Sequence, residues 1–192
     1  MSTIQRIVVG ISGASGALLA KYVLQCLSSF DQVETHLVMS NSAKRTLELE
    51  SGLQTDELQN LANCVYDNDD VGAAIASGSF KTAGMIIVPC SMKSVACIAN
   101  GISESLLLRA ADVMIKEQRP LVIVPREAPL SPIHLNNLLT LSRLSGVKII
   151  PPVINNYQHV KTIEELQIQI AYKLLDCFGL ECPQYRRWGT AY

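Results

Sequence analysis

The sequence of 192 residues has few charged side chains, and their charges nearly cancel. The 16 Lys and Arg against 17 Asp and Glu leave a formal net charge of −1. Phosphate contacts require a basic surface, so we expect no nucleic-acid partner. The charged fraction of 17% is also below the roughly 25% of an average soluble domain. We therefore expect a homo-oligomer in which subunit contacts cover part of the surface.

Long hydrophobic runs and paired cysteines are also missing. No apolar run reaches the roughly 18 residues that a membrane span needs, and the first residues do not have the pattern of a signal peptide. The six cysteines include no C-x-x-C pair, and the three histidines are scattered, so no zinc-site spacing is present. We expect reduced thiols, a cytoplasmic location, no membrane association and no bound metal.

Short runs rich in Val and Ile alternate with segments of helical periodicity. The predicted strands are 6–11, 34–39, 64–66, 84–88, 121–124 and 147–150. The predicted helices are 15–28, 42–49, 56–62, 103–117, 133–145 and one that begins near 163. This alternation predicts an α/β fold in one domain over residues 1–192: a doubly wound, flavodoxin/Rossmann-like three-layer sandwich with a parallel sheet.

In such a sheet, ligands bind beyond the carboxyl ends of the strands, so the residues after each strand are informative. Gly10, Gly13 and Gly16 have G-x-x-G-x-x-G spacing from the end of the first strand onward, and they open a helix whose N–H groups can face an anion. Polar residues follow the other strands: Ser40, Ser42, Ser91, Lys93, Ser94, Arg126, Glu127, Asn155, Asn156 and Tyr157. These positions predict one ligand-binding edge.

Each of these features also has a structural interpretation. The glycines can serve a tight turn, and the serines can be helix N-caps. Arg126 and Glu127 can form a surface ion pair, although the flanking prolines suit positioned side chains. Cys90 fits a small packing residue better than a nucleophile, because no histidine is placed to activate it.

One competing motif is Tyr157-x-x-x-Lys161, which matches the catalytic pair of short-chain dehydrogenases. The two residues precede the predicted helix cap at Thr162, so they do not share a helix. Ser40 also ends the second strand where a nicotinamide cofactor needs an acidic residue for its ribose. The sequence therefore disfavours that family.

Several segments together resemble the flavin prenyltransferases of the UbiX family, once described as small subunits of hydroxyaryl acid decarboxylases. The matching segments are 13–16 (GASG), 89–91 (PCS), 108–112 (LRAAD), 116–120 (KEQRP), 124–129 (VPREAP), 133–135 (IHL) and 187–189 (RWG). Their order and spacing fit along nearly the whole chain. The run 125–129 with its upstream R-A-A-D is specific, whereas the glycine turn alone is not.

The resemblance implies FMN as ligand and a metal-independent reaction. A dimethylallyl group from dimethylallyl phosphate is joined to N5 and C6 of reduced FMN, and a UbiD-type aromatic acid decarboxylase uses the prenylated FMN. A homododecamer with sites between subunits is implied as well. An FMN carrier or regulatory subunit of a hydroxyaryl acid decarboxylase, without prenyl transfer, is the alternative. The P-x-M-N-x-x-M-W motif of related cysteine decarboxylases is missing.

The resemblance also assigns roles to individual residues. Those implied to bind FMN are Gly13, Ala14, Ser15, Ser40, Ser91, Met92, Lys93, Ser94, Arg109 and Arg126. Those implied to bind the prenyl phosphate are Lys116, Arg126, Tyr157 and Lys173, the last in place of the family's usual Arg. Those implied in acid–base chemistry are Ser15, Glu50 and Glu127. Cations can stabilise a departing phosphate, and carboxylates with a pKa near neutrality can transfer protons.

Overall fold

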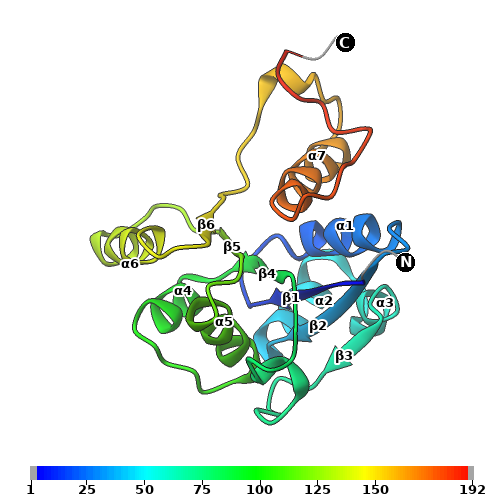
Figure 1. Cartoon of the computed structure of the whole chain (residues 1–192). Helices are drawn as coiled ribbons and strands as arrows, with labels where there is room; N and C mark the ends of the chain where they lie inside the picture. The colour runs from blue at the N-terminus through cyan, green and yellow to red at the C-terminus, as the bar shows by residue number, and fades with distance from the viewer. Residues whose placement is uncertain (1–3, 190–192) are drawn as a thin grey trace.

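The computed structural model describes residues 4–189 and has a parallel sheet of six strands between two layers of helices (Figure 1). The strands are β1 (Gln5–Ile11), β2 (Val33–Met39), β3 (Cys64–Tyr66), β4 (Gly84–Cys90), β5 (Leu121–Pro125) and β6 (Val147–Ile149). Their order is β3-β2-β1-β4-β5-β6, as in dinucleotide-binding folds. The predicted fold class is confirmed, and the order reverses between β1 and β4.

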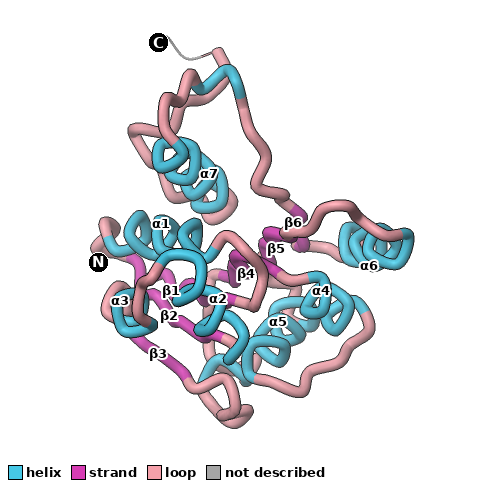
Figure 2. Tube along the Cα trace, turned by 180° about the vertical axis from the view of Figure 1, so that it is seen from behind, coloured by secondary structure: helices cyan, strands magenta, loops and turns pink. Residues whose placement is uncertain are grey.

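The helices divide between the two faces of the sheet (Figures 1 and 2). One face carries α1 (Ala17–Ser28), α2 (Asn41–Ser51), α3 (Thr55–Gln59) and α7 (Ile163–Asp176); the other carries α4 (Met92–Ala99), α5 (Leu106–Lys116) and the short 3₁₀ helix η1 (Ala74–Ala76). Successive residues of β1 point to opposite faces, so Val9 joins the first core and Val8 the second. Both cores bury Val, Ile and Leu, which explains the apolar strands of the sequence.

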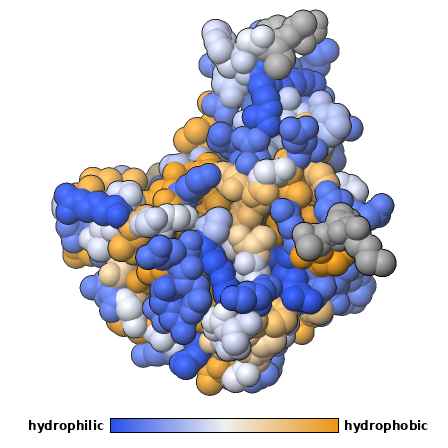
Figure 3. Space-filling model, in the orientation of Figure 1, coloured by the Kyte–Doolittle hydropathy of each residue, from blue (hydrophilic) through white to orange (hydrophobic). Residues whose placement is uncertain are grey.

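Two parts of the chain stand away from the sheet: α6 (Pro132–Ser142), and the segment between β6 and α7 that contains the 3₁₀ helix η2 (Asn156–Gln158) (Figure 1). Leu141 is the buried residue of α6, whereas Ile133 is 72% exposed. Hydrophobic side chains gather over α6 at the left of Figure 3. Exposed apolar surface of this kind marks an interaction surface, in line with the expected oligomer.

Several predicted boundaries differ from the structure. β4 continues through Pro89 to Cys90, because proline lacks only the N–H and the Pro89 carbonyl still accepts bonds from Ser12. Helix α4 was not predicted, since its eight residues directly follow the strand-end motif. Helix α5 starts at Leu106 instead of residue 103, because Ser105 is its N-cap. In the described part of the chain, no helix has the length and apolarity to cross a membrane.

Candidate functional site

The ends of β1 and β4 are joined by the buried hydroxyl of Ser12. Its Oγ donates to the carbonyl oxygen of Pro89 at 3.1 Å and accepts the N–H of Ser91 at 2.7 Å. These bonds hold the start of α4 against the glycine turn at the point where the strand order reverses. The sequence did not reveal Ser12, because its partners lie more than 70 residues away.

The turn after β1 requires glycine at Gly13 and at Gly16, for two separate reasons. A Cβ on Gly13 would lie 2.4 Å from Oγ of Ser42, so the start of α2 approaches the turn too closely for any side chain. Gly16 has a φ of 104°, a conformation that favours glycine. The structural interpretation of these glycines therefore holds.

The N-terminus of α1 already faces an anion that belongs to the protein. The N–H of Gly16 donates to Oε2 of Glu50, on the last turn of α2, at 2.9 Å. Burial raises the pKa of Glu50, but hydrogen bonds from Ser15, Gly16 and Ala17 and the charge of Arg126 together hold it below its usual value. The N–H groups of Gly16 and Ala17 at the start of α1 therefore already have the Glu50 carboxylate as their partner.

A polar cavity of about 220 Å³ lies beside this turn, where three helices begin. Ser40, Ser91 and Ser105 are the N-caps of α2, α4 and α5, so the structural interpretation of the first two serines is confirmed. Lys93 also lines the cavity. Because helix N-termini attract anions, this cavity suits a phosphate better than the start of α1 does.

Asn68 is a further residue of the polar cavity that the sequence did not single out. It is 8% exposed, and its Oδ1 accepts the N–H of Leu107 at 3.2 Å. Three residues predicted to contact FMN are buried nearby: Ala14, Met92 and Ser94. The buried Met92 side chain packs in the core, so only its backbone can serve a ligand.

An apolar cavity of about 180 Å³ lies on the other side of the turn. Its lining includes Ser15 and Arg126 together with apolar residues of β5, α1 and α7: Leu19, Val124, Ile163, Leu166 and Ile170. The N–H of Arg126 donates to the Cys90 carbonyl at 3.1 Å, which fixes the end of β5 beside β4. Glu127 is exposed, and its Oε1 accepts the N–H of Ala128.

Tyr157 and Lys173 belong to a separate group around the end of the chain. The Tyr157 ring meets Trp188 edge-on at 5.6 Å, and Lys173 lies 3.9 Å from Asp176, which binds Arg187. A cavity of about 750 Å³ lies between η2, α7 and residues 183–186, away from the glycine turn. Tyr157 is in η2 and Lys161 precedes α7, so the two do not share a helix, as predicted.

Lys116 and Arg109 are the remaining residues that the resemblance implied to bind the prenyl phosphate and FMN, respectively. Lys116 ends α5 just before β5 begins, so it lies at the edge opposite the carboxyl ends of the strands. Arg109 is exposed in the first turn of α5 and does not line any of the three cavities described above. One chain therefore brings Ser15, Glu50 and Arg126 together, but not Lys116.

A group of potential metal ligands lies elsewhere, on β2 and β3. One ligand atom each of Glu34, His36 and Cys64 lies within 4.8 Å of the others. Both ring nitrogens of His36 have neighbours at 2.9 Å, Tyr66 and Glu34, and Arg6 lies 3.4 Å from the same Glu34 oxygen. Burial lowers the pKa of His36, although Glu34 opposes this effect. The cation Arg6 already neutralises Glu34, so we assign this cluster a structural role.

The chain is similar to known proteins along nearly its whole length. A family model described as Flavoprotein matches residues 1–175. Flavin prenyltransferase LpdB of Lactiplantibacillus plantarum is 53% identical over 184 residues, which cover 96% of this chain and 98% of that protein. Flavin prenyltransferase UbiX of Thauera aromatica is 48% identical over 183 residues, which cover 95% and 93%.

Two solved structures resemble the whole chain. A dodecameric FMN-dependent UbiX-like decarboxylase from Escherichia coli O157:H7 has a TM-score of 0.93 at 47% identity, covering 97% of this chain and all of the other. AnUbiX in complex with FMN and dimethylallyl pyrophosphate has a TM-score of 0.94 at 44% identity, covering 98% and 100%. A cysteine decarboxylase of thioviridamide biosynthesis, 16% identical, shares the fold.

Proposed function

The chain belongs to the UbiX-type flavin prenyltransferases, and on this basis we propose that it joins a dimethylallyl group from dimethylallyl phosphate to N5 and C6 of reduced FMN. The observation that carries this proposal is the pair of cavities on either side of the glycine turn. One is polar and receives three helix N-termini, and the other is apolar and contains Arg126. A flavin nucleotide needs both environments.

The residues of the polar cavity suit the phosphate end of FMN. Ser40, Ser91 and Ser94 supply hydroxyls, and Lys93 supplies a positive charge. The bond between Ser12 and Ser91 fixes the start of α4, so the donors are in place before a ligand binds. The apolar cavity suits the ring and the prenyl chain, since Leu19 and Ile170 line it.

Proton transfer falls to groups at the edge of the apolar cavity. Glu50 is ionised near neutral pH and accepts a hydrogen bond from the Ser15 hydroxyl, so this pair can accept a proton through Ser15. Glu127 is exposed and directly follows Arg126, which lines the cavity, so its carboxyl group can donate or accept a proton. Reduced FMN, when bound, supplies the electron-rich ring that accepts the prenyl group.

The departing phosphate requires positive charge, which one chain supplies only in part. Arg126 lines the apolar cavity, whereas Lys116, Tyr157 and Lys173 lie in two other regions of the chain. We therefore place each complete site between copies of the chain. The exposed apolar surface of α6 and the dodecameric form of the Escherichia coli relative support this assembly.

Two further features stay predictions. A UbiD-type aromatic acid decarboxylase is the expected user of the prenylated FMN, because a modified flavin is useful only to an enzyme that binds it. The six free cysteines agree with the expected cytoplasmic location.

The decisive experiment mixes the purified protein with chemically reduced FMN and dimethylallyl phosphate under anaerobic conditions. Mass spectrometry should find a flavin that is heavier by one dimethylallyl unit. A parallel reaction with dimethylallyl diphosphate identifies the preferred donor. An FMN carrier or regulatory subunit would change neither compound, and that result would refute prenyl transfer.

A further inference from the structure

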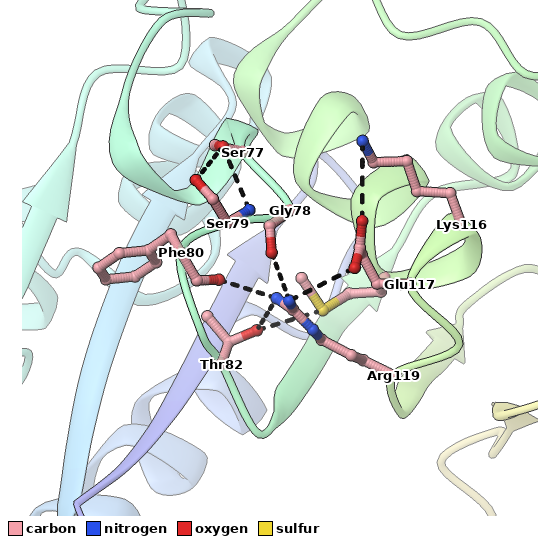
Figure 4. A network of polar contacts seen from close by, with 9 residues as sticks. Ser77, Gly78, Ser79, Phe80, Thr82, Lys116, Glu117 and Arg119 are labelled. Carbon is pink, nitrogen blue, oxygen red and sulfur yellow. Dashed lines mark hydrogen bonds and ion pairs between the residues drawn. The ribbon is translucent and has the colours of Figure 1, made fainter.

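Lys116 is held by neighbours that the prenyl-transfer proposal does not use. Its Nζ lies 3.9 Å from Oε1 of Glu117, and Oε2 of Glu117 lies 3.8 Å from Nη2 of Arg119 (Figure 4). The side chains are 55%, 35% and 12% exposed in that order. The ammonium of Lys116 is therefore at the outer end of a chain of charges that starts from a buried guanidinium.

Arg119 is fixed by the loop that precedes β4. Its guanidinium donates to the carbonyl oxygens of Gly78 at 2.5 Å and Phe80 at 2.8 Å, and to Oγ1 of Thr82 at 3.3 Å. Gln118 has a φ of 54°, and this turn at the end of α5 precedes Arg119. Three acceptors on one loop leave the guanidinium little freedom.

The position of the Glu117 carboxylate is also fixed by its close contact with Gly78. A Cβ on Gly78 would lie 2.2 Å from Oε1 and 2.7 Å from Cδ of Glu117, so the carboxylate lies directly on the glycine backbone. This contact is possible because Gly78 has no side chain. The carboxylate therefore has one defined place, between Arg119 and Lys116.

We propose that Glu117, seated on Gly78 and paired with Arg119, is a positioning residue that holds the Lys116 ammonium ready for the prenyl phosphate in a neighbouring copy's site. This inference rests on the proposed function and on the role of Lys116 in it. A free lysine side chain loses much rotamer freedom when it binds a phosphate, and an ion pair that already restricts it reduces that loss.

Gly78→Ala tests the position of the carboxylate without changing any charge. The new methyl group must displace the flexible end of Glu117, which leaves the fold intact. We expect KM for dimethylallyl phosphate to rise about two- to fivefold, the range for an exposed ion pair, while kcat and FMN affinity stay unchanged. Gly72→Ala is the matched control, because its Cβ would meet only Oδ1 of Asp70, at 3.6 Å. An unchanged KM in Gly78→Ala would overturn the proposal.

Glu117→Gln separates positioning from simple electrostatics, because the two predict opposite signs. Removing a negative charge beside Lys116 should lower KM if only the net charge mattered. Loss of positioning should raise KM instead, and Arg119→Lys should do the same although it keeps the charge, since an ammonium cannot reach all three loop acceptors. A lowered KM in Glu117→Gln would refute the proposal.

Lys116→Ala distinguishes failure of this inference from failure of the proposed function. We expect its KM to rise at least tenfold, and Gly78→Ala to add nothing in the Lys116→Ala background, because both changes act through one ammonium. If wild type makes no prenylated FMN, the proposed function fails. If wild type is active but Lys116→Ala has a normal KM, prenyl transfer stands and the positioning proposal falls.

Discussion

Glu50→Gln is the sharpest test of the site, because this carboxylate occupies the start of α1. Gln keeps the shape and can still accept the N–H of Gly16, so the variant removes mainly the negative charge at the helix terminus. Glu50 is exposed, and a charge at an exposed helix terminus contributes at most about 1 kcal/mol. For a chain of this length, that loss lowers Tm by about 2–4 °C.

The pH dependence of this Tm difference shows whether the negative charge of Glu50 is its cause. The pKa of Glu50 is below its usual value in the folded protein, so the carboxylate stabilises the fold fully above the pKa that it has when unfolded. This contribution is lost as the pH falls through the folded pKa. The Tm difference between wild type and Glu50→Gln should therefore be constant near neutral pH and disappear in acid.

Thermal shift measurements between pH 3.5 and 8 (about the range that spans an ordinary Glu pKa), at one protein concentration, provide the assay. Glu48→Gln is the matched control, since it makes the same change two residues earlier on α2. A Tm difference that persisted unchanged in acid would refute the electrostatic reasoning. So would an equal effect of Glu48→Gln.

Three further predictions follow from the site and the surface. Glu127→Gln should leave FMN binding nearly unchanged and reduce turnover by roughly 10²–10⁴-fold, the scale of general acid–base catalysis, in a steady-state assay; full activity would assign the proton to Glu50 or to the released phosphate. Ser12→Ala should cost about 1–3 kcal/mol, because the buried N–H of Ser91 loses its acceptor, and should weaken FMN binding in a fluorescence titration; an unchanged Tm and affinity would contradict the role of Ser12. Light scattering at micromolar concentration should find a particle much larger than the 20.9 kDa chain; a monodisperse monomer would refute assembly.

The sequence predicted the sheet well because local patterns determine it. The Val- and Ile-rich strands β1, β4 and β5 are buried on both faces, and Thr162 caps α7 where the sequence placed the helix cap. Helix α4 escaped prediction because a short helix directly after a strand-end motif has too few turns to show periodicity.

The site was predictable in composition but not in arrangement. The pairing of Glu50 with Gly16 joins residues 34 positions apart, and no local pattern records it. Lys116 and Arg126 are only ten residues apart, yet the intervening β5 carries them to opposite edges of the sheet. Sequence spacing therefore identified the residues and did not show which of them one chain can bring together.

The separation of Lys116 from Arg126 has a genetic consequence under the proposed assembly. A site that takes its lysine from one copy and its arginine from another can be repaired by mixing two impaired variants. Copies with Lys116→Ala and copies with Glu127→Gln, assembled together, would form some sites in which both residues are intact. With one type of substitution, each faulty copy places its defect in a neighbour's site, although the number of faulty sites still equals the number of faulty copies.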